Sequence, residues 1–187
     1  MRPGLSLRIC AAALVLAAAL TGLVVREGVA RTQGREVTLA IDAYDPRSVL
    51  SGHYVRFQLV DSTPPGQACP PGTEAAGADW AALSRADGRY RVTGAAASRR
   101  EAQALGEMVV RGHATCAGHR EDAARRIRLD LGVDRMHLDQ RQAEAIAGAL
   151  AAGGGPSPLA VISVDDSGKA RLKGLIVEGR RIELSWL

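Results

Sequence analysis

Hydrophobic and polar residues follow three different patterns along this chain. Ile9–Val25 is almost continuously apolar, interrupted by Cys10, Thr21 and Gly22. A run of this length lies at the short end of the ~17–25 residues that cross a bilayer as a helix. Most of the later chain alternates apolar with polar residues, which is the period of half-buried strands. Asp139–Ala152 has helical spacing instead.

The alternating segments predict a series of short strands joined by turns. In Glu36–Asp42 the apolar residues Val37, Leu39 and Ile41 share one face. Asp87-Gly88 separates two later segments with strong hairpin-turn chemistry. The predicted strands are Glu36–Asp42, Tyr54–Val60, Trp80–Leu83, Arg89–Thr93, Glu107–Thr115, Ile127–Val133, Leu159–Val164, Lys169–Val177 and Arg180–Trp186.

The segments between these strands complete the predicted fold. Thr63–Gly77 holds four prolines and three glycines, which exclude regular structure and indicate an exposed loop. In the helical segment, Asp139 is a candidate N-cap with Gln142 three residues later. We therefore predict a mainly β (α+β) fold, a small antiparallel barrel or sandwich of about eight strands with one helix near Asp139–Ala152.

The apolar run divides the chain into an N-terminal segment, residues 1–30, and a β-rich domain, residues 31–187. Arg2 and Arg8 precede the run and orient it with the N-terminus in the cytoplasm, so that the domain lies outside it. A signal peptide cleaved after Ala30 is the alternative. Arg26 and Glu27 favour an uncleaved transmembrane anchor, because signal peptides are usually uncharged there.

Charge and motif content exclude two classes of function. The chain carries 24 basic and 20 acidic residues, a formal net charge of +4, and the basic residues form no long run with interleaved aromatics. Nucleic-acid binding therefore has no support. Gly153–Gly155 ends a helix and leads into Pro156, so it cannot be a phosphate-binding loop that opens one. The sequence indicates no nucleotide and no other cofactor.

The stretch Ala43–Leu59, AYDPRSVLSGHYVRFQL, carries the most specific motif. It resembles the signature of the GDYXXLXY family, which commonly reads DPRDLLRGDYVRLRY just after a membrane anchor. The matching residues are Asp45, Pro46, Arg47, Gly52, Tyr54, Val55 and Arg56. This chain has His53 where the family has Asp, Phe57 where it has Leu, and Leu59 where it has Tyr. Weaker similarity continues through Val109–Gly112, Ile127–Gly132 and Ala170–Gly174.

The resemblance implies a membrane-anchored bacterial protein that acts with a multi-pass membrane partner, and it supplies no catalytic residues. The expected location is the inner membrane, with a single span and the domain in the periplasm. Our leading hypothesis is a non-enzymatic accessory or interaction subunit. Its expected interaction surface is the signature loop, with Asp45, Pro46, Arg47, Gly52, His53, Tyr54 and Arg56, because such loops carry function more often than cores do. The alternative is that the loop only turns the chain.

Cys69 and Cys116 lie in segments expected to be loops. In an oxidising compartment such a pair forms a disulfide, and free thiols are the alternative. His113, Cys116 and His119 also allow a metal- or redox-active site, with a fourth ligand from His53, His137 or Cys69. Disulfide formation and thiolate ligation exclude each other at Cys116.

A membrane-bound hydrolase is a third hypothesis. Membrane-anchored β domains include Ser–Lys proteases, whose mechanism requires a serine beside a desolvated lysine. Ser48 and Ser51 lie in the signature loop, and Lys169 and Lys173 are the only lysines. No pattern in the sequence brings these serines and lysines together.

Overall fold

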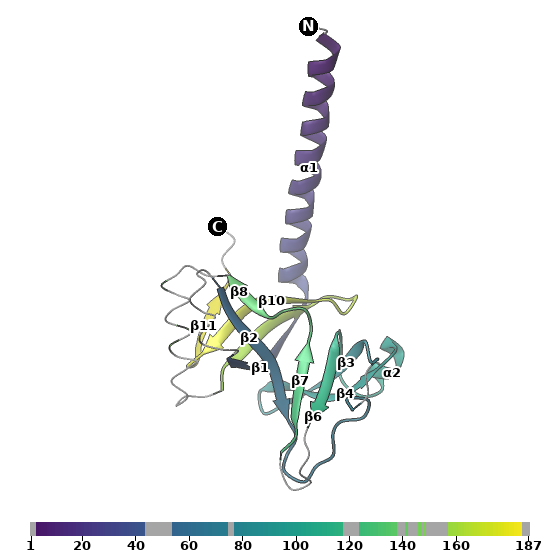
Figure 1. The fold of residues 1–187 in the computed structure, drawn as a ribbon, viewed down its shortest axis with the longest axis vertical. Helices are drawn as coiled ribbons and strands as arrows, with labels where there is room; N and C mark the ends of the chain where they lie inside the picture. The colour runs from purple at the N-terminus through teal and green to yellow at the C-terminus, as the bar shows by residue number, and fades with distance from the viewer. Residues whose placement is uncertain are drawn as a thin grey trace.

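The computed structural model of the protein describes residues 3–43, 54–74, 77–117, 124–137 and 157–184, together with Arg141, Ile146 and Gly148. Within these residues a long N-terminal helix runs directly into a β domain (Figure 1). The helices are α1 (Pro3–Gln33) and α2 (Arg99–Gln103). The strands are β1 (Arg35–Ala43), β2 (Tyr54–Ser62), β3 (Trp80–Ala86), β4 (Arg89–Ala96), β5 (Met108–Arg111), β6 (His113–Ala117), β7 (Arg126–Asp130), β8 (Arg135–His137), β9 (Leu159–Val164), β10 (Ala170–Val177) and β11 (Arg180–Glu183).

Eight of these strands form one antiparallel sheet in the order β11-β10-β9-β1-β2-β7-β6, with β8 also paired to β2. Strand β2 pairs with β1 along one edge, and along its other edge the neighbouring strand changes from β8 to β7. Its first residues pair with β8, with Tyr54 opposite His137, and its later residues pair with β7, with Leu59 opposite Leu129. The described strands run from β11 at one edge to β6 at the other and do not close into a barrel.

The remaining strands form a small sheet in the order β4-β3-β5, which packs against the large one. The two sheets share a single hydrophobic core to which Val37 and Phe57 contribute from the large sheet and Leu83 and Val110 from the small one. Helix α2 covers the opposite face of the small sheet, where its Ala102 packs with Ala82 and Val109. The mainly β prediction is confirmed, and the arrangement fits a sandwich.

Two predicted strands end earlier in the structure than alternation suggests. The segment predicted as one strand, Glu107–Thr115, is divided at Gly112 into β5 of the small sheet and β6 of the large sheet. Gly112 has a φ of 150°, and a Cβ there would lie 2.3 Å from the Asp130 carbonyl oxygen. Strand β7 likewise ends at Asp130, because Gly132 has a φ of 71°. The alternation of apolar and polar residues continues through both glycines, but the backbone leaves the extended conformation at each of them, and the strand ends there.

The helix predictions have mixed outcomes. Helix α2 was not predicted, although Ser98 and Glu101 form a capping box at its start. Most of the predicted helix near Asp139–Ala152 lies outside the described residues. Its described members Arg141, Ile146 and Gly148 are helical, and Ile146 is buried in the core. Trp186, which the alternation predicts to point into the core, also lies outside the described residues.

The proline-rich loop is attached to both sheets. Its Pro71 carbonyl accepts a hydrogen bond from the Ala95 amide of β4, and its Thr73 carbonyl accepts one from the Cys116 amide of β6, each at 2.9 Å. Cys69 of the loop and Cys116 of β6 form a disulfide, which confirms that prediction. The loop therefore joins an edge of the small sheet to an edge of the large one.

The disulfide should contribute strongly to stability because it closes a long segment of chain. Its two cysteines are 47 residues apart, and on the chain-entropy model a loop of that length is worth about 4 kcal/mol. We expect the double variant Cys69→Ala/Cys116→Ala to lose about 3–4 kcal/mol of unfolding free energy. Guanidinium denaturation of the full chain in detergent, followed by circular dichroism, measures this loss. Reduced wild-type protein is the control and should match the variant, whereas a variant as stable as the oxidised protein would contradict the prediction.

Candidate functional site: the junction of helix α1 and the β domain

Helix α1 exposes a long apolar surface that the β domain does not cover. Leu7–Gln33 is the one helix among the described residues that is long and apolar enough to cross a membrane, and its most apolar stretch of 18 residues has a mean hydropathy of 2.2. Its large apolar side chains are between 44% and 72% exposed, and no part of the β domain covers its apolar window. A lone helix with this much exposed apolar surface is stable when lipid covers it. The helix therefore suggests a single-pass membrane anchor.

No flexible linker separates this helix from the β domain. Helix α1 ends at Gln33 and β1 begins at Arg35, so Gly34 alone makes the corner. A Cβ on Gly34 would lie 2.2 Å from the Ser163 hydroxyl oxygen and 2.8 Å from the Val164 carbonyl oxygen of β9. Glycine permits this close approach because it has no side chain. The last turns of α1 consequently contact β9 and β10.

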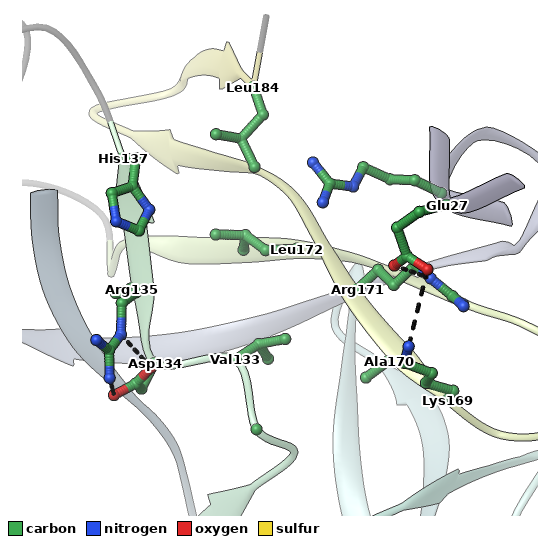
Figure 2. Close-up of a pocket in the computed structure, with 12 residues that line it drawn as sticks. Glu27, Val133, Asp134, Arg135, His137, Lys169, Ala170, Arg171, Leu172 and Leu184 are labelled. Carbon is green, nitrogen blue, oxygen red and sulfur yellow. Dashed lines mark hydrogen bonds and ion pairs between the residues drawn. The ribbon is translucent and has the colours of Figure 1, made fainter. Parts of the chain in front are cut away.

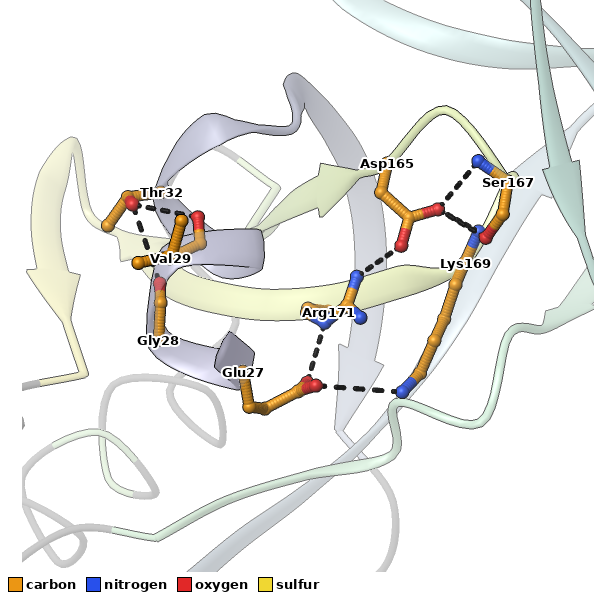
Figure 3. Close-up of polar contacts among 8 residues, drawn as sticks. All are labelled: Glu27, Gly28, Val29, Thr32, Asp165, Ser167, Lys169 and Arg171. Carbon is orange, nitrogen blue, oxygen red and sulfur yellow. Dashed lines mark hydrogen bonds and ion pairs between the residues drawn. The ribbon is translucent and has the colours of Figure 1, made fainter. Parts of the chain in front are cut away.

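A chain of ion pairs holds the end of α1 on strand β10 (Figure 3). The Arg171 guanidinium of β10 donates from Nε to Glu27 at 2.5 Å and from Nη1 to Asp165 at 2.7 Å. Only 9% of the Arg171 side chain is exposed. A guanidinium so deeply buried is stable only when its donors are bound to acceptors. Glu27 also lies 3.8 Å from the Lys169 ammonium.

Asp165 orders the turn that positions these residues. Its Oδ1 accepts hydrogen bonds from the amides of Ser167 and Lys169 at 2.9 and 3.0 Å and from the Ser167 hydroxyl at 2.6 Å. Burial by itself raises the pKa of the Asp165 carboxyl, but the hydrogen bonds from Arg171 and Ser167 hold it well below its ordinary value. Asp165 is therefore ionised at neutral pH and can balance the Arg171 charge.

A second acid holds the other side of the corner. Glu36 of β1 accepts hydrogen bonds from Lys173 of β10 at 3.0 Å and from both terminal nitrogens of Arg181 of β11 at 2.7 and 3.0 Å. The Arg181 hydrogen bonds are the main cause that lowers the pKa of Glu36 to about 2. Acids on both sides of Gly34 are thus bound by basic residues of the C-terminal strands.

A pocket of about 690 Å³ opens beside this junction. We call it the junction pocket: it lies between the last turns of α1, residues 132–137 and strand β10 (Figure 2). Its charged lining comprises Glu27, Arg31, Asp134, Arg135, Lys169 and Arg171. Val133, Leu172 and Leu184 supply apolar surface.

The lining charges on the β8 side are already paired. Asp134 binds its neighbour Arg135 through two hydrogen bonds of 2.9 and 3.1 Å, which lower the pKa of the Asp134 carboxyl. Asp134 also lies 3.9 Å from Arg56 of β2. The lining has four basic and two acidic side chains, and Asp165 adds a third acid that shares Arg171 with Glu27, so the balance of these groups is one positive charge.

Most of the predicted interaction surface lies outside the described residues. Asp45, Pro46, Arg47, Gly52 and His53 fall within residues 44–53, of which nothing is described.

The chain that leaves this loop is described. Tyr54 begins β2 opposite His137, and Arg56 lies opposite Arg135. His137 and Arg135 both line the junction pocket, so Tyr54–Arg56 of the signature pair with the strand that forms one wall of that pocket.

The structure does not bring the proposed metal ligands together. On β6, His113 points to the exposed face and Cys116 to the buried one, because they are an odd number of residues apart in a strand. Cys116 is bound in the disulfide, and His113 Nδ1 lies 2.8 Å from the Ala78 carbonyl oxygen. His119 lies outside the described residues, and those that are described contain no cluster of three metal-ligating side chains.

The hydrolase hypothesis gains no support from the described residues. Ser48 and Ser51 lie in the signature loop, outside the described residues. The Lys169 side chain is 59% exposed and faces Glu27. A lysine that serves as a general base needs a desolvated site, and the exposed side chain of Lys169 does not have one.

Sequence reasoning missed the residues that build the junction. Glu27 was interpreted only as a charge unsuited to a signal peptide, and Arg171 only as a strand residue. One signal could have found them: Lys169, Arg171 and Lys173 place three basic residues at alternate positions of a strand that is otherwise apolar. Such a stripe indicates acidic partners on a neighbouring element.

Comparison with known proteins places the chain in a family. The family model described as GDYXXLXY protein matches residues 16–175, most of the chain. The chain belongs to the GDYXXLXY family. The match spans the second half of the apolar run, the signature and strand β10, so the GDYXXLXY segment includes the junction residues Glu27, Glu36 and Arg171. Curated proteins gave no match, and neither did solved structures.

Replacing the buried arginine should release the end of α1 from the domain. In Arg171→Met the helix loses its hydrogen bond from Nε, and Glu27 and Asp165 lose their shared counter-charge. Glu27 is partly exposed, so we expect a local loss of about 1–3 kcal/mol, below the usual cost of breaking a fully buried pair. Amide hydrogen exchange of residues 27–33 in the full chain should accelerate about 5- to 150-fold.

Arg181→Met is the matched control for this exchange measurement. It removes a partner of Glu36 but no contact with α1, so amides 27–33 should keep their protection. Unchanged exchange in Arg171→Met would show that the ion pairs do not hold the helix.

Low pH should destabilise the corner at Gly34, because it protonates Glu36. Its folded pKa of about 2 lies below the ordinary value of 4.5. The ionised carboxylate therefore stabilises the fold fully above pH 4.5, and this contribution is lost as the pH falls toward 2. Wild type should be more stable than Glu36→Gln at neutral pH, and the difference should shrink across that window. Denaturant titrations at several pH values test this, because other acids titrate equally in both proteins, and a pH-independent difference would contradict it.

Proposed function

We propose that this protein is a single-pass inner-membrane protein whose periplasmic β domain is an accessory subunit for a multi-pass membrane partner. The observation that carries the proposal is the direct junction between α1 and the β domain. Gly34 is the only residue between them, and Arg171 binds the last turns of the helix to the sheet. A domain attached in this way keeps a constant height and orientation relative to its helix, as a subunit that contacts a neighbour in the membrane requires.

The location and orientation are supported by chemistry at both ends of the helix. Arg2 and Arg8 precede the apolar run and favour a cytoplasmic N-terminus. The Cys69–Cys116 disulfide is typical of a domain in an oxidising compartment. Together they favour a domain on the far side of the inner membrane from the cytoplasm.

Two further observations favour an accessory role over a catalytic one. The charged side chains at the junction are engaged in ion pairs that hold the fold together, rather than directed at a position where substrate could react. The family resemblance implies a multi-pass partner, and α1 offers that partner an exposed apolar surface between Leu7 and Val25.

Site-specific photocrosslinking in membranes of the native host tests this function. A photoreactive residue at Leu16, Leu20 or Leu23, each more than half exposed on α1, should capture one multi-pass membrane protein. The yield should depend on position, because one face of a helix contacts a neighbour. The same residue at Arg85, in the hairpin of the small sheet, is the control. Capture of lipid alone at every helix position, with no partner at near-stoichiometric yield after purification, would overturn the proposal.

A further inference from the structure

We propose that the junction pocket binds the headgroup of an anionic phospholipid from the leaflet beside it. This inference rests on the membrane anchoring proposed above and adds a ligand to it. The pocket lies between α1, β8 and β10. Figure 1 shows these strands at the end of the domain from which α1 emerges. The pocket is therefore on the face of the domain that the anchor holds toward the membrane.

The depth of the pocket matches that of the lipid headgroups. The apolar run ends at Val25, and Glu27 and Arg31 line the pocket. At a rise of about 1.5 Å per residue these two lie about 3 and 9 Å beyond the apolar run. The headgroup layer of each leaflet is about 5–8 Å thick. The helical wall of the pocket therefore crosses the headgroup layer.

The charges of the pocket suit an anion. Four cationic side chains and two carboxylates line it, and each carboxylate is bound by a cation at hydrogen-bonding distance. The Lys169 ammonium is 3.8 Å from Glu27, beyond a hydrogen bond, and its side chain is 59% exposed, so its donors can reach an incoming phosphate. Lipid phosphate is the anion present at the highest local concentration at this depth.

The remaining surface of the pocket fits the rest of a lipid. Val133, Leu172 and Leu184 are apolar and lie between the β8 residues and the charged end of α1 (Figure 2). A phosphate against Lys169 would leave the glycerol and the first acyl carbons near these side chains. A volume of about 690 Å³ accommodates a ligand of that size.

Native mass spectrometry of the full chain in detergent tests this site. The probes are phosphatidylglycerol, phosphatidylcholine and inorganic phosphate. We expect phosphatidylglycerol to bind at least about tenfold more tightly than phosphatidylcholine, and Lys169→Glu to remove that preference, because each basic residue near a lipid surface contributes several-fold to binding. Lys169→Gln, which introduces no repulsion with Glu27, should lose about threefold to fivefold.

Arg85→Glu is the matched control, since it changes the charge by the same amount in the hairpin of the small sheet, where no residue lines the pocket. It should keep the preference. An equal loss in Arg85→Glu, or equal binding of both lipids, would overturn the site. Competition by inorganic phosphate at concentrations similar to those of the lipid would identify a phosphate site instead and would overturn the lipid as its source.

A photoreactive residue at position 169 separates a lipid from an acidic segment of a partner protein. In vesicles of equal parts phosphatidylglycerol and phosphatidylcholine, and in native membranes, the expected adduct is a phospholipid. A protein adduct in native membranes would overturn the inference. Release of the chain from the membranes by an alkaline carbonate wash would contradict the membrane anchor itself, and with it the proposed function. A chain that stays in the membrane and crosslinks through α1, but shows no lipid preference, would refute the headgroup site alone.

Discussion

The buried guanidinium of Arg171 is the contact on which the arrangement of this molecule depends. Withdrawing such a charge from water is expensive, and the cost is offset only while both Glu27 and Asp165 accept its hydrogen bonds. Glu27 belongs to the helix and Asp165 to the turn between β9 and β10. The arginine therefore favours this position of the helix on the sheet, because a displaced helix leaves the Arg171 Nε without the Glu27 acceptor.

The turn between β9 and β10 also contacts the small sheet. Gly168 approaches the Trp80 ring so closely that a Cβ would lie 2.5 Å from it, and the Gly168 carbonyl accepts a hydrogen bond from the Arg111 amide at 2.8 Å. Arg111 in turn lies over the Trp80 ring, 5.2 Å from its centroid. Helix α1, the large sheet and the small sheet thus meet around one short turn.

The local alternation of apolar and polar residues was sufficient to predict most of the strands. Val37, Leu39 and Ile41 are all buried in β1, as their alternation predicts, because a strand with one face on a core must place every second residue there. Alternation could not show where a strand ends when a glycine turns the backbone. At Gly112 the chain leaves one sheet for another, and only the Asp130 carbonyl that crowds this position explains why a glycine is needed. Helix α2 was too short for a periodic signal.

The sequence by itself determined the long apolar helix, the buried faces of most strands and the choice of the two cysteines, because run length, hydrophobic period and residue type are read directly from the chain. Tertiary structure alone decided which charges meet. Glu27 and Arg171 are 144 residues apart, and in the sequence each resembles the many solvated acids and arginines of this chain. Burial is what distinguishes them, and burial is set by how the helix lies on the sheet. The junction pocket has the same origin, since its walls come from α1, the β8 segment and β10, which are brought together only by the fold.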